Sequence, residues 1–117
     1  MACGEILIVE DDEDIRSTLR EVLEIEGYVV HTAAHGQEGL DVLETIGRPC
    51  VVLLDMMMPV MNGWEFISAL EAKGTLGQTP VVVVSAAGER ARAPQAVEYV
   101  RKPIDLESLL QTIERYC

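Results

Sequence analysis

The sequence predicts a single α/β domain in which a doubly wound, five-stranded parallel sheet carries helices on both faces. Two observations lead to this fold class. Short apolar runs alternate with longer segments whose apolar residues recur at helical spacing. The runs are apolar at successive positions, which is typical of parallel strands buried on both faces. A chain of 117 residues suits one core, so we expect residues 1–117 to form one domain with no output domain after it.

The first two strand–helix units are clear in the sequence. Residues 6–9 are all apolar and predict a buried strand. From Asp12 onward the apolar residues recur every three or four positions, which predicts a helix that stops at Gly27. Residues 28–32 predict the second strand, and residues 36–46 predict the second helix because their large apolar side chains share one face.

The middle of the chain predicts a third strand, a third helix and a fourth strand. Residues 51–54 and 81–84 are the two apolar runs. Between them, Asn62 is a suitable N-cap for a helix that ends near Gly74. The same alternation of strand and helix therefore continues through this part of the chain.

The connection to the fifth strand, residues 97–100, departs from this alternation. Neighbouring parallel strands are joined by about a dozen residues that usually include a helix. Here residues 86–96 are only eleven, and Gly88 and Pro94 interrupt them. We therefore expect a short turn of helix or an irregular loop in place of the fourth helix. After the fifth strand, Asp105 predicts the start of a last helix.

Composition and charge exclude several classes of protein. With 20 acidic and 9 basic residues, the formal net charge is −11, which disfavours direct binding to nucleic acid or to an anionic membrane. The apolar runs are too short for membrane insertion, and the first residues do not form a signal peptide. Cys3, Cys50 and Cys117 are odd in number and widely spaced, so we expect neither a disulfide framework nor a zinc site. A cytoplasmic location follows as the default expectation.

Polar residues stand where four of the predicted strands end. Glu10 and Asp11 follow the first strand, Asp55 the third, Ser85 the fourth and Lys102 the fifth. The carboxyl ends of parallel strands lie at one edge of a sheet, where functional groups of open α/β folds collect. We therefore expect these five side chains to lie close together.

A cluster of carboxylates without His or Cys favours a hard divalent cation, and Mg²⁺ is the best candidate. Such a site can support phosphoryl transfer, with Asp55 as the nucleophile, Lys102 paired to one phosphoryl oxygen and Ser85 hydrogen-bonded to another. Simpler roles exist for single residues: Asp12 and Asp14 can serve as caps of the following helix. The chemical interpretation therefore depends on the strand ends taken together.

Four segments carry these residues, and they are residues 6–12 (ILIVEDD), 53–63 (LLDMMMPVMNG), 82–86 (VVVSA) and 99–103 (YVRKP). Together, and in this order, they resemble the receiver domain of bacterial two-component response regulators over essentially the whole chain. The resemblance implies a flavodoxin-like fold with strand order 2-1-3-4-5. Lys102 follows Ser85 by 17 residues, about one helical turn fewer than is usual in the family. The shortfall again falls on the fourth helix.

The resemblance also implies roles for individual residues. Asp55 is similar to the family's phosphoacceptor. Glu10 and Asp11 resemble the acidic pair that binds Mg²⁺, and Met57 occupies the position that lends a backbone carbonyl to the metal. Lys102 resembles the lysine that contacts the phosphoryl group, and the family suggests a cis peptide bond after it.

Signalling in such a domain would depend on two further residues. Ser85 resembles the switch hydroxyl, and Tyr99 the aromatic residue that moves inward when the hydroxyl engages phosphate. The implied donor is a sensor histidine kinase or a phosphotransfer protein. The implied output is an unnamed downstream protein, and a second copy of the chain is a further candidate partner. The domain would catalyse only its own phosphorylation and dephosphorylation, so we do not expect an enzyme.

One alternative stays open on the sequence. A receiver-like module could act only as a protein docking surface without being phosphorylated, and the shortened fourth crossover is compatible with that function. Two other classes fit poorly. A phosphatase of the haloacid dehalogenase type requires a different acidic motif after the first strand, and a nucleotide or flavin binder requires N–H donors where this chain has carboxylates.

Overall fold

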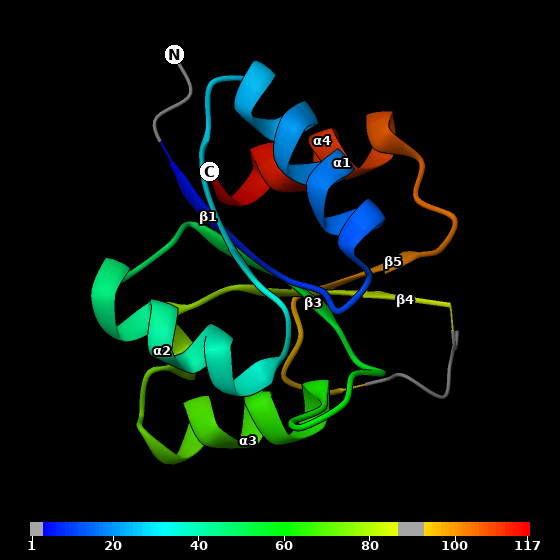
Figure 1. Cartoon of the computed structure of the whole chain (residues 1–117). Coiled ribbons are helices and arrows are strands. Elements are labelled where there is room, and N and C mark those ends of the chain that lie inside the picture. The colour runs from blue at the N-terminus through cyan, green and yellow to red at the C-terminus, as the bar shows by residue number, and fades with distance from the viewer. Residues whose placement is uncertain (1–3, 87–92) are drawn as a thin grey trace.

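The computed structural model of the chain describes residues 4–86 and 93–117. Its strands form one five-stranded parallel sheet in the order β2-β1-β3-β4-β5, which confirms the predicted fold class and strand order (Figure 1). The strands are β1 (Glu5–Val9), β2 (Val29–Ala33), β3 (Val51–Asp55), β4 (Val81–Ser85) and β5 (Glu98–Arg101). Every bound lies within one residue of its predicted position.

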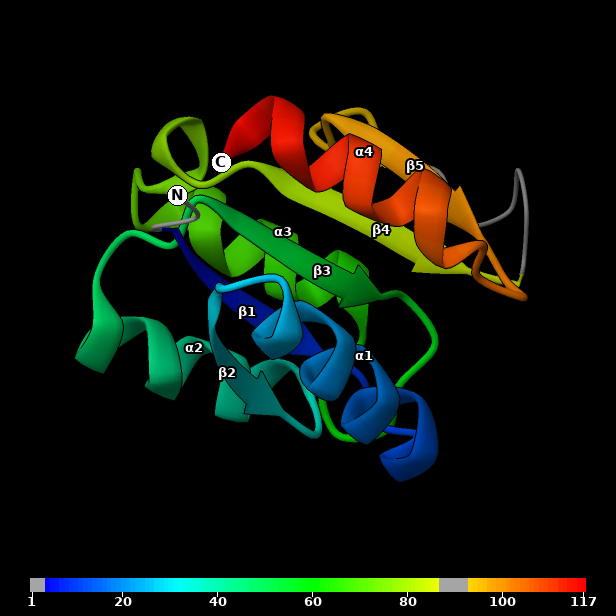
Figure 2. The ribbon, with the colours of Figure 1, turned by 90° about the horizontal axis from the view of Figure 1, so that it is seen from above.

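Four α-helices in the described residues cover the two faces of the sheet. They are α1 (Glu13–Ile25), α2 (Gly36–Ile46), α3 (Gly63–Ala72) and α4 (Leu106–Tyr116), and a short 3-10 turn, η1 (Leu76–Gln78), follows α3. Helices α1 and α4 lie on one face, and α2 and α3 lie on the other (Figures 1 and 2). Within the described ranges, no helix is long and apolar enough to cross a membrane.

The sheet separates two hydrophobic cores because successive side chains of a strand point to opposite faces. On the side of α1 and α4, Leu53 packs with Leu109 and Ile113. On the side of α2 and α3, Leu54 packs with Phe66, whose side chain is fully buried. All five residues of β3 and all five of β4 are buried. These two central strands therefore give the residues at their ends fixed positions.

Side chains cap all four α-helices found in the described residues. Asp12 accepts hydrogen bonds from the first turn of α1, as predicted, and Asp105 caps α4 in the same way. Asn62 caps α3 as predicted and forms a reciprocal capping box with Glu65. The cap of α2 was not predicted: it is His35, whose Nδ1 accepts a backbone N–H at 3.2 Å.

The two edge strands correct the expectation that all strands are apolar and buried on both faces. In β5 half-buried and exposed residues alternate, and Tyr99 is 44% exposed. In β2, Val29 is 55% exposed. An edge strand has a neighbour on one side only, so its residues are enclosed less completely than those of β3 and β4.

The shortened crossover between β4 and β5 carries no helix in its described part, which comprises residues 86 and 93–97. Residues 87–92, on which the rest of this prediction falls, lie outside the described residues. Ala93 is buried against the face that α2 and α3 cover. The described end of the crossover is therefore packed onto the sheet before β5 begins.

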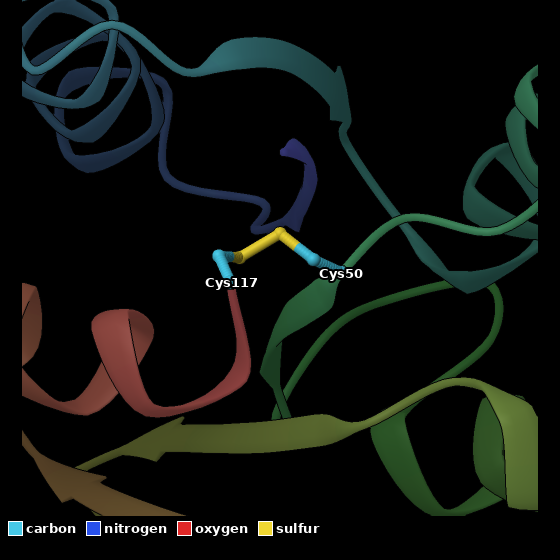
Figure 3. The surroundings of a disulfide bond; sticks show 2 residues. All are labelled: Cys50 and Cys117. Carbon is cyan, nitrogen blue, oxygen red and sulfur yellow. A yellow bond between two sulfur atoms is a disulfide. The ribbon is translucent and has the colours of Figure 1, made fainter. Parts of the chain in front are cut away.

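Cys50 and Cys117 form a disulfide bond, which corrects the expectation that the cysteines are not bridged (Figure 3). Their Cα atoms are 5.2 Å apart, a usual distance for a disulfide. Cys50 directly precedes β3, and Cys117 follows the last turn of α4. The two cysteines are 67 residues apart in sequence, and their spacing does not reveal that these two elements meet at one end of the sheet. Cys3 lies outside the described residues.

Candidate functional site

The predicted polar residues meet at the carboxyl ends of the strands. Glu10, Asp11 and Asp55 each offer a carboxylate oxygen, and these three oxygens all lie within 4.8 Å of one another. Glu10 and Asp55 are buried, at 2% and 6% exposure, whereas Asp11 is exposed. Ser85 is also buried and follows Val84, the residue that pairs with Asp55 in the sheet. The cluster is therefore open to solvent on the side of Asp11.

Lys102 brings a positive charge into this cluster. Its Nζ lies 2.8 Å from Oε1 of Glu10 and 3.8 Å from Oδ2 of Asp55. Its backbone N–H donates to the carbonyl of Ser85 at 3.2 Å, which ties the end of β5 to the end of β4. The peptide bond from Lys102 to Pro103 is cis, as the family resemblance suggested. In this arrangement the ammonium group is paired more closely with Glu10 than with Asp55.

Asp55 has an unusual proton affinity in this setting. Burial, then the negative charge of Glu10 and a hydrogen bond with Asp11, raise the pKa of Asp55 from 3.8 to about 7. Lys102 and the backbone N–H of Met57 oppose this rise by stabilising the carboxylate. Without a further cation, the cluster thus holds more negative charge than its surroundings stabilise.

The pKa of Lys102 moves in the opposite sense to that of an isolated buried lysine. Burial lowers it, but the hydrogen bond to Glu10 and the charges of Asp55, Glu10 and Asp11 raise it by more, so that the net pKa lies above its usual range. Lys102 therefore remains an ammonium group throughout the neutral range. One fixed cation faces three carboxyl groups.

The loop between β1 and α1 holds Glu10 in place. One carboxylate oxygen of Glu10 accepts the backbone N–H of Asp12 at 3.1 Å. The backbone carbonyl of Glu10 accepts a hydrogen bond from Nη1 of Arg16 at 2.8 Å. The sequence did not predict a role for Arg16. It lies one helical turn beyond the N-cap Asp12, and an arginine at such a position on an exposed helix ordinarily points to solvent. Its contact orients the main chain that carries the acidic pair.

The loop between β3 and α3 holds Asp55 from the other side. The backbone N–H of Met57 donates to Oδ1 of Asp55 at 3.3 Å. Met56 and Met58 are buried, whereas the Met57 side chain is 62% exposed. Gly63 allows the loop to close, since a Cβ there would overlap Met56. Trp64 and the three methionines line a hollow at this loop, so Trp64 fluorescence can report on it.

Tyr99 projects from the face of the sheet that carries Ser85. In the parallel register Tyr99 pairs with Val83 and Arg101 pairs with Ser85, so Tyr99 and Ser85 share one face. The Tyr99 hydroxyl accepts the backbone N–H of Ala93 at 2.9 Å and donates to the Ala93 carbonyl. The half-exposed ring is thus fastened to the end of the β4–β5 crossover, a contact that the sequence did not predict.

Comparison with known proteins points to one family. The family model described as "Response regulator receiver domain" matches residues 6–114. The uncharacterized transcriptional regulatory protein YkoG of Bacillus subtilis is 40% identical over 121 residues, which cover 97% of this chain and 50% of that protein. The chain spans half or less of the length of the first curated relatives that it matches.

Solved structures agree with this similarity. The chemotaxis protein CheY4 of Vibrio cholerae is 30% identical, with a TM-score of 0.88, and the match covers 99% of this chain and 100% of that one. The response regulator TrrA of Thermotoga maritima, solved in complex with Mg²⁺-BeF, is 28% identical with a TM-score of 0.85, and the match covers 98% and 100% of the two chains.

Proposed function

Because the chain belongs to the family of response regulator receiver domains, we propose that it is a phosphoacceptor switch in which Asp55 receives the phosphoryl group. The observation that carries the proposal is the cluster itself. A buried aspartate lies at the end of β3 with two further carboxylates beside it and one lysine ammonium 3.8 Å from its oxygen. A docking module without phosphorylation does not require this combination, so the docking alternative is not favoured.

The residues fit a bound Mg²⁺ ion. Glu10, Asp11 and Asp55 supply hard oxygen ligands, and burial together with the negative charge of Glu10 raises the pKa of Asp55, so that a bound cation would stabilise its ionised form. Together with the backbone carbonyl of Met57, these residues would hold the ion, and the presence of Mg²⁺-BeF in the similar structure of TrrA supports binding of Mg²⁺. When bound, Mg²⁺ would neutralise charge on the phosphoryl oxygens.

The covalent step is a phosphoryl transfer from a phosphohistidine of a sensor histidine kinase or a phosphotransfer protein. An oxygen of the ionised Asp55 attacks phosphorus, the P–N bond breaks, and the electron pair leaves on the imidazole, which takes up a proton. Lys102 pairs with one phosphoryl oxygen and the Ser85 hydroxyl donates to another. The domain thereby promotes only its own phosphorylation and later hydrolysis, and it turns over no other substrate.

Transmission of the signal follows from the position of Tyr99. A phosphoryl group adds up to two negative charges beside Ser85 and Lys102 and draws both groups toward it. Movement of the β4 end opens space for the Tyr99 ring, which must release its two hydrogen bonds to Ala93 in order to turn inward. The surface around β5 and the crossover would then present a different shape to a downstream protein or to a second copy of the chain. We place the domain in the cytoplasm, where its kinase partner would present phosphohistidine.

The decisive experiment is the intact mass of the protein after incubation with acetyl phosphate and Mg²⁺. A gain of one phosphoryl group is expected, and it should be lost in Asp55→Asn and after chelation of Mg²⁺. Asp41→Asn is the matched control, because Asp41 is an exposed aspartate on α2. If acetyl phosphate and a phosphorylated histidine kinase both leave the mass unchanged, the phosphoacceptor proposal is wrong.

A further inference from the structure

The disulfide lies at the opposite end of the sheet from the acidic cluster. Asp55 ends β3, whereas Cys50 directly precedes it, and Cys117 closes α4 (Figure 3). The bond therefore connects the central strand with the last helix of the fold. Nothing in the proposed phosphoryl transfer uses either cysteine, so the pair requires its own explanation.

Backbone hydrogen bonds position each cysteine independently of the sulfur bond. The N–H of Cys50 donates to the carbonyl of Glu5 at 2.8 Å, next to the β1–β3 pairing. The N–H of Cys117 donates to the carbonyl of Ile113 at 2.9 Å, within the last turn of α4. Each cysteine is thus held on its own element, and the buried side chains of Leu109 and Ile113 pack α4 against the sheet, so that breaking the bond would leave two neighbouring thiols. A dithiol held in this way can form the bond again.

The two cysteine residues differ in exposure. Cys50 is half-buried, and its sulfur occupies the space that a side chain at Gly4 would need: a Cβ there would overlap Cys50 Sγ and lie 3.3 Å from Cys117 Sγ. Cys117 is exposed at the end of its helix. Gly4 thus lies beside both sulfur atoms, and Cys117, the more exposed of the two residues, offers the more open side of the bond to an attacking thiolate.

We propose that Cys50 and Cys117 form a reversible thiol–disulfide exchange site for dithiol reductants, and that its oxidation state controls how firmly the end of α4 is held to the sheet. The proposal rests on the cytoplasmic location given with the proposed function, because disulfides in reducing compartments are mostly transient or redox-sensing. The geometry of the pair itself does not depend on phosphorylation.

The exchange proceeds in two steps. A thiolate of the dithiol attacks Cys117 Sγ, the S–S bond breaks, and its electron pair leaves on Cys50 Sγ, which takes up a proton. The second thiolate of the reductant then attacks the mixed disulfide and releases Cys117 as a thiolate, which is protonated in turn. The protein gains two electrons and two protons, and the dithiol leaves as its cyclic disulfide.

The test uses the full chain with Cys3→Ser, so that only two cysteines remain. The protein is equilibrated in graded mixtures of reduced and oxidised dithiothreitol without denaturant, quenched with acid, alkylated and weighed. The proposal expects zero alkyl groups on the oxidised protein and two on the reduced protein. The fraction of reduced protein at each dithiothreitol ratio should be the same whether the starting protein is oxidised or reduced. Reduction should lower the melting temperature by about 10 °C, because the bond closes a 67-residue separation.

Hydrogen exchange distinguishes a held helix from a general loss of stability. On reduction, amides in the last turn of α4 should lose at least about tenfold more protection than amides of β3, whose residues are all buried. The double variant Cys50→Ser/Cys117→Ser is the control. In reduced and in oxidised dithiothreitol alike, its amide protection should equal that of the reduced protein.

Two results would overturn the proposal. In the first, both cysteines are alkylated at every dithiothreitol ratio, which means that no bond forms. In the second, the bond resists reduction until urea unfolds the protein, which makes it a permanent link. Asp55→Asn should show the same exchange curve as the parent, so failure of the phosphoacceptor proposal would leave this result unchanged.

Discussion

Replacing Asp55 by asparagine should stabilise the metal-free protein, and the gain should grow with pH. Folding raises the pKa of Asp55 from 3.8 to about 7. The folded protein therefore holds a proton on Asp55 at pH values where the unfolded chain has released it. Below pH 3.8 both states are protonated, and the residue does not oppose folding. As the pH rises from 3.8 to about 7, ionising the buried carboxyl opposes folding increasingly, and above that range the penalty is constant.

The magnitude follows from the two pKa values. Each pH unit between them corresponds to about 1.4 kcal/mol, so the penalty reaches about 4 kcal/mol at pH 8 and about 2 kcal/mol at pH 5. Asp55 is only 6% exposed, so solvent screens this effect little. Asparagine has nearly the same shape and carries no charge. The free energy of unfolding of Asp55→Asn should exceed that of the parent by these amounts, with the larger difference at pH 8.

Urea unfolding followed by Trp64 fluorescence measures this difference. Both proteins are compared at pH 5 and pH 8 in a chelator, with the disulfide kept oxidised. Added Mg²⁺ should raise the stability of the parent at pH 8 much more than that of the variant. Asp41→Asn, at an exposed position, should change stability by less than about 0.5 kcal/mol at both pH values. A gain from Asp55→Asn that is equal at pH 5 and pH 8 would refute the reasoning, because it could not come from ionisation of Asp55.

Three further predictions follow from the site. Lys102→Met removes the partner 2.8 Å from the buried Glu10, and it should destabilise the protein at pH 8 by about 3 kcal/mol in urea unfolding. Tyr99→Phe removes both hydrogen bonds to Ala93. Its rate of phosphorylation by acetyl phosphate should stay within about twofold of that of the parent protein, while hydrogen exchange of the Ala93 amide should become faster. Met57→Asn places an amide that can orient water beside the acceptor, so the phosphoprotein should lose its phosphoryl group about tenfold faster, as followed by intact mass.

The fold could be predicted closely because its signals are local. Buried parallel strands leave uninterrupted apolar runs, and side chains at their carboxyl ends must share one edge of the sheet. This rule alone predicts that Glu10, Asp55, Ser85 and Lys102 lie together. The N-caps at Asp12, Asn62 and Asp105 are also local, since each depends on the few residues that follow it.

What the sequence did not reveal depends on contacts between distant segments. The disulfide requires that the residue before β3 and the end of α4 meet, and no pattern in the spacing of Cys50 and Cys117 encodes this. The contact of Arg16 with the Glu10 carbonyl depends on the rotamer of a long side chain. The partner of Tyr99 depends on where the crossover lies, and the raised pKa of Asp55 depends on burial by several elements at once.

Helix α4 joins the two proposed sites. Its N-cap, Asp105, lies three residues after Lys102, and its last turn ends at Cys117. A phosphoryl group on Asp55 would pull on the start of α4 through Lys102. The disulfide holds the other end of α4 to Cys50, directly before β3. Because β3 is buried along its whole length, it serves as a rigid support between the two sites rather than as a moving part. In the proposed scheme, α4 is therefore the element on which a phosphorylation signal and a redox signal act together, each at a different end.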